Sequence, residues 1–166
     1  MRSTISWWAA RFRQFRSHLR ARVEPQERTV LATWISPAQL ALFDSMHAAD
    51  RRHGLDVVAS LRAERVTELD VLLAGLLHDA GKGNIGVWPR VAYALAATYG
   101  QWLLAVVRWL PGFRAALERL RRHADRSVEL AEAAGCPART VELIRFQDAP
   151  IDPEFGELLR LADEAN

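Results

Sequence analysis

The sequence predicts an all-α fold, and three observations lead to this prediction. Apolar residues recur at helical spacing along most of the 166-residue chain. Helix start and stop signals separate these apolar segments. No stretch shows the alternating, β-branched pattern that is typical of a strand. We therefore expect about seven helices joined by short connections.

Residues 1–24 predict a basic amphipathic helix that precedes a helical domain of residues 25–166. Four apolar residues share one face of this helix: Trp8, Phe12, Phe15 and Leu19. Six arginines and one glutamate give residues 1–24 a charge of +5, whereas the rest of the chain has 16 basic and 19 acidic residues, a charge of −3. The body of the protein thus has no excess of positive charge, and we expect no specific nucleic-acid binding. The helix docks on the domain, contacts an anionic membrane or acidic partner through residues 5–23, or, as a third alternative, contacts nucleic acid.

The next helix boundaries are marked by capping residues. Ser36 followed by Pro37 and Gln39 predicts an N-cap, a first helical residue and a capping box. Gly135 followed by Pro137 predicts the end of one helix and the start of another. Each signal depends only on residues within one helical turn.

Two further helix starts are predicted, one at Thr67 and one at Asp152. Thr67 is expected to cap a helix of residues 68–80, and a preceding helix is expected over residues 48–62. Asp152 is expected to cap a last helix of residues 153–165. A short turn between the first two helices predicts an antiparallel helical hairpin.

Residues 91–107 form an uncharged run of 17 residues. The run is close to the shortest length that spans a membrane, but polar residues interrupt its middle. We expect a buried or interfacial helix, and any apolar surface left uncovered would favour a homodimer. The single cysteine, Cys136, and an N-terminus without a secretory signal pattern predict a cytoplasmic protein, peripheral to the membrane if the N-terminal helix binds lipid.

The strongest local motif is the stretch His78-Asp79-Ala80-Gly81-Lys82, which follows an apolar helix. Its lysine is the only one in the chain. In a chain of this composition a His-Asp pair followed by Gly and Lys at these positions arises by chance on the order of one time in ten thousand. The motif therefore indicates chemistry more strongly than a bare His-Asp pair does.

The predicted hairpin brings two histidines to the same height. His53 precedes the turn by about nine residues and His78 follows it by about ten, so both lie about 14 to 15 Å from the turn. Two level imidazoles with the Asp79 carboxylate beside one of them are a plausible start to a divalent-metal site. The alternative is that each histidine caps a helix end or lies exposed.

Asp163 is a candidate for a further oxygen ligand. It follows leucines at helical spacing and is expected at the margin of the buried face of the last helix. An unpaired carboxylate there would be costly, and a metal would compensate its burial. The alternative is a solvated carboxylate near the end of the sequence.

These residues together resemble the HD superfamily of metal-dependent phosphohydrolases. The signature of that family is a histidine, then a His-Asp pair, then a distant aspartate, and it matches His53, His78, Asp79 and Asp163. The resemblance covers residues 45–166. It implies an HD-domain-like helical bundle, a divalent ion such as Mn, Fe, Mg, Co or Ni, and hydrolysis of a phosphate ester or anhydride.

The HDxGK form is closer to family members with two metals, which add histidines between the HD pair and the last aspartate. His123 matches one of these positions and is a predicted metal ligand, with an ordinary surface histidine as the alternative. Where such members often have a further histidine, this chain has Gln147, a poor ligand, followed by Asp148, which could substitute. Lys82 stands where members acting on nucleoside monophosphates carry Glu, and neither a downstream Glu-Asp pair nor Gly-Tyr-Pro is present. We expect one firm metal and a second that is weak or absent.

The residues and the resemblance predict a hydrolase for a small phosphorylated, nucleotide-like molecule, acting through a metal-activated water. Asp79 and Lys82 are the predicted catalytic residues, and Lys82 would neutralise charge that develops on the phosphoryl group. Arg52 is a second predicted phosphate contact. The alternative is a catalytically degenerate binding or regulatory module, associated with a membrane or partner through its N-terminal helix.

Overall fold

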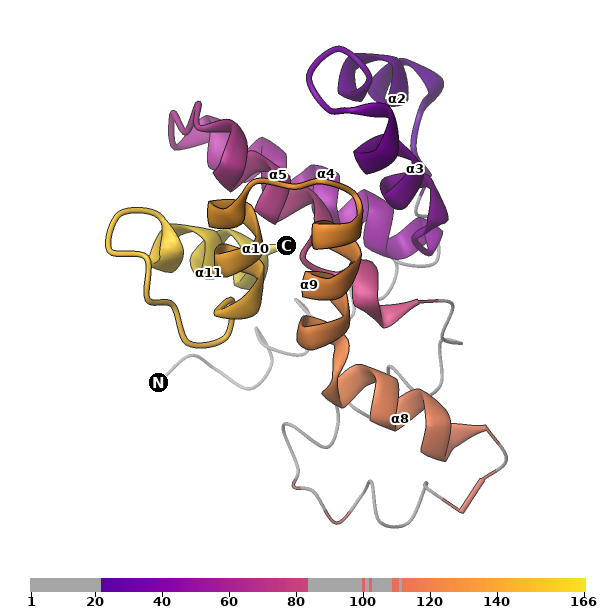
Figure 1. Cartoon of the computed structure of the whole chain (residues 1–166). Helices are drawn as coiled ribbons and strands as arrows, with labels where there is room; N and C mark the ends of the chain where they lie inside the picture. Colours follow the sequence, from indigo (N-terminus) through magenta and orange to yellow (C-terminus); the bar gives the residue numbers. More distant parts are fainter. Residues whose placement is uncertain (1–21, 84–99, 101, 103–108, 111) are drawn as a thin grey trace, which may run out of the picture.

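The computed structural model describes residues 22–83, 100, 102, 109, 110 and 112–166 (Figure 1). Within this part of the chain the structure has eight α-helices, one short 3-10 helix and no strand, which confirms the predicted all-α fold. The elements before the gap are α2 (Pro25–Leu31), α3 (Pro37–Ser45), α4 (Ala48–Ala63), α5 (Leu69–Leu77) and the 3-10 helix η1 (Ala80–Lys82). Those after it are α8 (Phe113–Arg121), α9 (His123–Ala133), α10 (Ala138–Arg145) and α11 (Gly156–Ala165).

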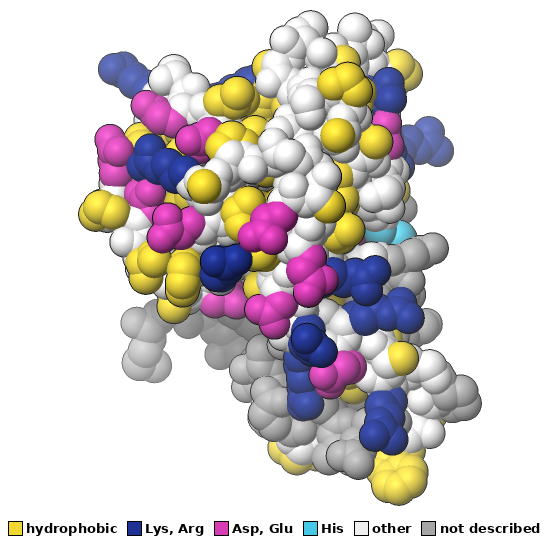
Figure 2. Space-filling model, in the orientation of Figure 1, with side chains coloured by type: hydrophobic (Ala, Val, Ile, Leu, Met, Phe, Trp, Pro, Cys, Tyr) yellow, Lys and Arg dark blue, Asp and Glu magenta, His cyan; other side chains and the backbone are white. Residues whose placement is uncertain are grey.

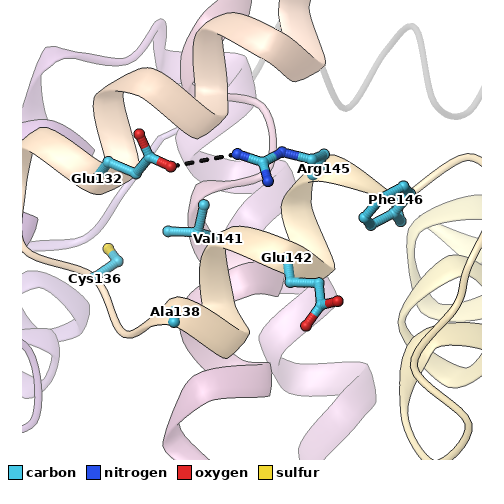
Figure 3. A pocket seen from close by; sticks show the side chains of 7 residues that line it. All are labelled: Glu132, Cys136, Ala138, Val141, Glu142, Arg145 and Phe146. Atoms are coloured by element: carbon cyan, nitrogen blue, oxygen red, sulfur yellow. Dashed lines mark hydrogen bonds and ion pairs between the residues drawn. The ribbon is translucent and has the colours of Figure 1, made fainter.

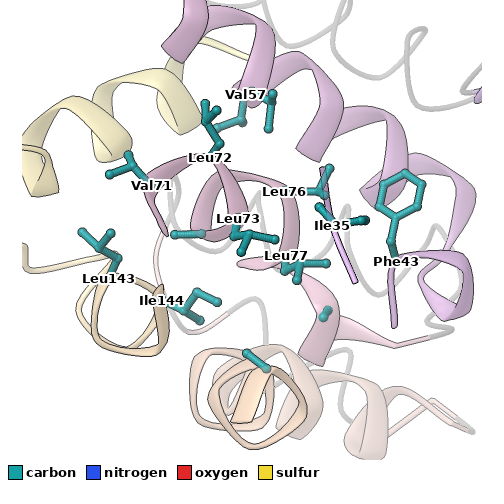
Figure 4. Close-up of a cluster of buried hydrophobic side chains, with 14 of the residues drawn as sticks. Ile35, Phe43, Val57, Val71, Leu72, Leu73, Leu76, Leu77, Leu143 and Ile144 are labelled. Carbon is teal, nitrogen blue, oxygen red and sulfur yellow. The ribbon is translucent and has the colours of Figure 1, made fainter. Parts of the chain in front are cut away.

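Helix α5 is the centre of the core. Every residue from Val71 to Leu77 is buried, because α4, α10, α11 and α3 all pack against this helix. Figure 4 shows its valine and leucine side chains meeting Val57, Leu143 and Ile144 from the surrounding helices. A helix that is apolar all round needs such neighbours on every side. The residue that follows it, His78, therefore emerges from the middle of the protein.

Local capping signals account for several boundaries. The capping box at the start of α3 is confirmed: the Ser36 hydroxyl accepts the Gln39 backbone N–H, and the side-chain Oε1 of Gln39 accepts the Ser36 backbone N–H. The predicted break between α9 and α10 is also confirmed, with Gly135 at a φ of 69°. At that positive φ a side chain would be strained, which explains the glycine.

Other predicted boundaries are wrong by a few residues. Glu68, not Thr67, is the N-cap of α5, and its carboxylate accepts the Thr67 N–H instead of an N–H of the first helical turn. The helix ends at Leu77 rather than at residue 80, because Lys82 N–H bonds back to the Asp79 carbonyl in a tighter turn. Helix α11 begins at Gly156 rather than at residue 153.

Several predictions concern residues that the structure does not describe. The N-terminal amphipathic helix lies almost wholly in residues 1–21, and the apolar run of residues 91–107 lies mostly in residues 84–99 and 103–108. The division at residue 24 and the homodimer stay predictions. Among the described residues, none of the helices combines the length and the apolar character that crossing a membrane requires. On the face shown in Figure 2, acidic and basic side chains lie interspersed.

Candidate metal centre

Three side chains from three separate helices converge beside the end of α5. His53 comes from α4, His78 is the C-cap of α5, and Asp163 comes from α11; one ligand atom from each lies within 4.8 Å of the others. Asp163 Oδ1 lies 2.7 Å from His53 Nε2 and 3.3 Å from His78 Nε2. Two imidazole nitrogens and one carboxylate oxygen at this spacing could hold a divalent ion.

A close approach between α4 and α5 brings the two histidines together. A Cβ on Gly54 would lie 2.5 Å from the Leu76 carbonyl oxygen, so only glycine allows this contact. The neighbouring rings of His53 and His78 meet edge to face with their centroids 5.2 Å apart. The level position that the hairpin predicts for the two histidines is therefore confirmed.

The orientation of His78 leaves one nitrogen for the centre. Its Nδ1 lies 3.0 Å from the Gly75 carbonyl oxygen, which can only accept, so Nδ1 carries the proton of this hydrogen bond. Its Nε2 is buried and makes no hydrogen bond. Metal-binding histidines commonly hold their second nitrogen against a backbone carbonyl in this way. The buried, unbonded Nε2 is the observation that best fits a metal ligand.

The charges of the centre depend strongly on one another. Burial alone would disfavour the charged imidazolium of His78, but Asp79 and Asp163 outweigh this effect and raise its pKa to about 9. Burial would likewise raise the pKa of Asp163, yet the two histidines hold it well below its usual range. The Asp163 side chain is 41% exposed, so the centre is open to solvent on the α11 side.

Asp79, the fourth metal ligand that the HD resemblance implies, lies next to the three converging residues and is not one of them, so its role as a ligand stays a prediction. Its side chain is only 3% exposed, and Oδ2 is bonded to Lys82 Nζ at 2.5 Å. Its Oδ1 lies 3.6 Å from His78 Nε2 and 3.9 Å from His123 Nε2. Burial opposes ionisation of Asp79, but Lys82 and the nearby histidines lower its pKa below the usual range. The carboxylate thus stands charged between the two imidazoles.

Lys82 is held by acidic groups on the protein. Burial would lower its pKa, but Asp79 raises it, with Asp50 and Asp163 contributing. A quarter of its side chain remains exposed. The predicted role of Lys82 in binding phosphate stays a prediction.

His123 reaches the centre because α9 approaches η1 very closely. A Cβ on Gly81 would lie 2.1 Å from the His123 carbonyl oxygen, and the Gly81 N–H donates to Ser127 Oγ at 2.8 Å. This contact explains the glycine of the motif. It also brings together residues 79 and 123, which lie on either side of the undescribed segment. The metal-ligand role of His123 stays a prediction, because its contacts in the structure are with Asp79, Gln147 and a carbonyl.

The guanidinium of Arg52 is engaged by two carboxylates. It lies 2.7 Å from Glu27 on α2 and 2.9 Å from Asp56 on α4 itself. Both carboxylates compete with any phosphate for this side chain. The predicted phosphate contact of Arg52 has no support in these pairs and stays a prediction.

Sequence reasoning missed the burial of Asp50 and the contact that Gln147 makes near the centre. Asp50 is 2% exposed, lies on α4 three residues before His53, and contributes to the charge around Lys82. In the sequence it reads as an ordinary acidic residue in the first turn of a helix. Gln147 is 8% exposed and contacts His123, a relationship that no spacing in the sequence reveals.

An open pocket of about 480 Å³ lies between α9 and α10 (Figure 3). Its edge carries an ion pair of 3.3 Å between Glu132 and Arg145, and none of its lining residues belongs to the converging triad.

No protein-family model, curated protein or solved structure matches the chain. The assignment of a metal centre therefore depends on the geometry of His53, His78 and Asp163.

Proposed function

We propose that the protein is a metal-dependent phosphohydrolase that acts on a small phosphorylated, nucleotide-like molecule. The observation that carries this proposal is the convergence of His53, His78 and Asp163 from three helices, with their ligand atoms within 4.8 Å. The resemblance of the same residues, with Asp79, to the HD signature supports the reaction class. The Asp163 carboxylate of the proposed centre is half-exposed, so a small substrate can reach it.

The three converging residues would hold the ion. Imidazole and carboxylate together suit Mn, Fe, Co or Ni, and Mg to a lesser degree. A bound divalent ion would lower the pKa of a water and so supply a nucleophile for attack on phosphorus. His78 is oriented for binding by the Gly75 carbonyl, and Asp163 is placed by the packing of α11 on α4.

The neighbouring charged residues have separate roles in this proposal. Asp79, fixed through Oδ2 by Lys82, presents Oδ1 to the centre and would be a further ligand of the ion. Lys82 keeps Asp79 ionised and adds positive charge beside the position of the substrate phosphate.

A binding or regulatory module without turnover is the second candidate function. The observation that favours it is that both predicted phosphate contacts are already paired within the protein, Arg52 with Glu27 and Asp56, and Lys82 with Asp79. Such a module would keep the metal and bind its ligand without hydrolysing it.

Metal content and turnover separate these candidates. Purified protein would be dialysed against Mn²⁺, analysed by elemental mass spectrometry and assayed with a panel of nucleotides and sugar phosphates. The hydrolase proposal expects bound metal and metal-dependent phosphate release, both lost in Asp163→Asn, and release lost in Asp79→Ala. Asp125→Asn is the matched control, because Asp125 is an exposed carboxylate on α9. Bound metal without release across the panel would favour the module, and a metal-free wild type would refute both candidates.

The N-terminal helix is tested independently of the centre. A peripheral membrane contact through residues 5–23 predicts that the full chain floats with anionic liposomes and that a chain starting at Pro25 does not. Equal behaviour of the two chains would contradict that contact. The cytoplasmic location stays a prediction.

A further inference from the structure

His123 has a defined orientation at the edge of the centre. Its Nδ1 lies 2.7 Å from the Leu120 carbonyl oxygen, and because a carbonyl only accepts, Nδ1 carries the proton. The other nitrogen, Nε2, faces Asp79 Oδ1 at 3.9 Å. His123 Nε2 is therefore the atom through which this residue would bind a cation.

Gln147 lies against that same atom. Its amide nitrogen is 3.3 Å from His123 Nε2, and its side chain is 8% exposed. An amide N–H can only donate, so this contact occupies the one lone pair of the neutral imidazole. The carbonyl oxygen of the Gln147 amide is buried and has no hydrogen-bond partner. Gln147 thus meets His123 with its donor and leaves its acceptor unused.

The second carboxylate oxygen of Asp79, Oδ2, is also engaged. Lys82 Nζ is bonded to Asp79 Oδ2 at 2.5 Å and places a positive charge on the carboxylate that His123 Nε2 faces. A second divalent ion between these two residues would have to displace the Gln147 hydrogen bond and approach the ammonium group. Both requirements oppose its binding.

We propose that Gln147 is a positioning residue that keeps His123 out of metal coordination, so that the centre binds a single divalent ion. The proposal rests on the metal centre of the proposed function and specifies its stoichiometry. A single bound ion would supply the activated water, without the second ion that clamps the leaving oxygen in two-metal sites.

The unused acceptor of Gln147 indicates how the second position could be opened. Turning the amide over would place its oxygen against His123 Nε2, and two acceptors repel each other unless a cation lies between them. Gln147→Glu removes the donor and adds a charged oxygen at this point. Gln147→His replaces the amide with a further imidazole ligand. Either substitution should create a position for a second ion next to Asp79.

The test uses Mn²⁺ as the probe, with equilibrium dialysis for stoichiometry and electron paramagnetic resonance for coupling between ions. We expect one Mn²⁺ per wild-type chain and an uncoupled signal, with any second Mn²⁺ binding at least about 100-fold more weakly. Gln147→Glu and Gln147→His should bind two Mn²⁺ with a spin-coupled signal. Adding His123→Ala to either variant should restore one ion. Gln39→Glu is the matched control, a second buried glutamine whose capping role a carboxylate can fulfil, and it should stay at one.

The outcomes distinguish this inference from the proposed function. Two coupled Mn²⁺ in the wild type would overturn the role of Gln147 and leave the metal centre intact. One ion in the wild type and in both folded Gln147 variants, with circular dichroism showing native helicity, would also overturn it. No Mn²⁺ in the wild type would overturn the metal centre and the inference together.

Discussion

Gly54 on α4 lies directly against the backbone of Leu76 on α5, so closely that a Cβ would stand 2.5 Å from the Leu76 carbonyl oxygen. This contact sets the distance between the two helices that carry His53 and His78. A backbone carbonyl in a buried helix cannot move aside as a flexible side chain can. The spacing of the proposed metal ligands therefore depends on a residue that is not a ligand.

The first prediction follows from that contact. Gly54→Ala should force α4 and α5 apart and lower the free energy of unfolding by about 1–3 kcal/mol, and Mn²⁺ affinity should fall with it. Gly75→Ala is the control, because its Cβ would meet side chains rather than backbone, those of Leu61, Val57 and Leu159 at 2.9, 3.0 and 3.5 Å. Urea unfolding and Mn²⁺ titration of both variants provide the measurement. Equal losses in the two variants would contradict the role of the Gly54 contact.

A second prediction concerns the cation that Lys82 provides. Lys82→Met leaves the buried Asp79 carboxylate without its partner and should destabilise the metal-free protein by about 2–4 kcal/mol. Saturating Mn²⁺ should raise the melting temperature of this variant more than that of the wild type, because the ion replaces the missing positive charge. Lys82→Arg keeps the charge and should resemble the wild type. A metal-induced rise no larger than in the wild type would contradict the prediction.

Metal binding should release a proton. With its pKa raised to about 9, chiefly by Asp79 against the opposing effect of burial, His78 is protonated at pH 7.5 in the metal-free protein. An ion can bind Nε2 only after that proton leaves, so affinity should rise with pH up to about 9. Calorimetry in buffers of different ionisation enthalpy should show release of about one proton per ion at pH 7.5. Binding heats that do not depend on the buffer would refute this expectation.

The last prediction concerns acid stability at the start of α11. Asp152 Oδ2 is 2.9 Å from Arg139 Nε on α10, and its Oδ1 accepts the N–H groups of Glu154 and Phe155. The bond to Arg139, with the backbone bonds, lowers the pKa of Asp152 from 3.8 to about 2. Because the folded value lies below the unfolded one, this carboxylate stabilises the protein fully above pH 3.8 and loses its effect as pH falls through about 2.

Asp152→Asn should therefore be less stable than the wild type at pH 7, and the difference should shrink towards pH 3. Urea unfolding at both pH values measures it. Asp125→Asn, which changes an exposed carboxylate on α9, serves for comparison and should change little. A stability difference that stays constant from pH 7 to pH 3 would contradict the prediction.

The features that the sequence predicts well depend on short stretches of chain. The capping box of Ser36 and Gln39 and the break at Gly135 are confirmed, because each involves neighbours within one or two helical turns. The level heights of His53 and His78 could also be predicted, since a short turn links their helices. The predicted start of α5 is wrong by one residue, and Glu68 is the N-cap without a side-chain capping bond that would mark the boundary.

The partners of the charged residues near the centre could not be predicted in this way. The engagement of Arg52 by Glu27 depends on how α2 packs beside α4. The burial of Asp50 depends on the same packing of α4 against its neighbours. The spacing of residues along the sequence predicts neither relationship. The angle at which two helices pack decides which of their side chains meet, and hydrophobic periodicity does not specify that angle.

By itself the sequence determines the helical class, the apolar face of each helix, and the order of the His, His-Asp and Asp residues along the chain. The tertiary structure decides that Asp163 meets His53 across a separation of 110 residues, and that Gln147 meets His123 across 24. The physical reason is that hydrophobic periodicity specifies which face of a helix is buried. Packing decides which other helix covers that face and how closely the two helices approach. Gly54 and Gly81 are where that packing brings two backbones into contact, and the proposed centre lies between these contacts.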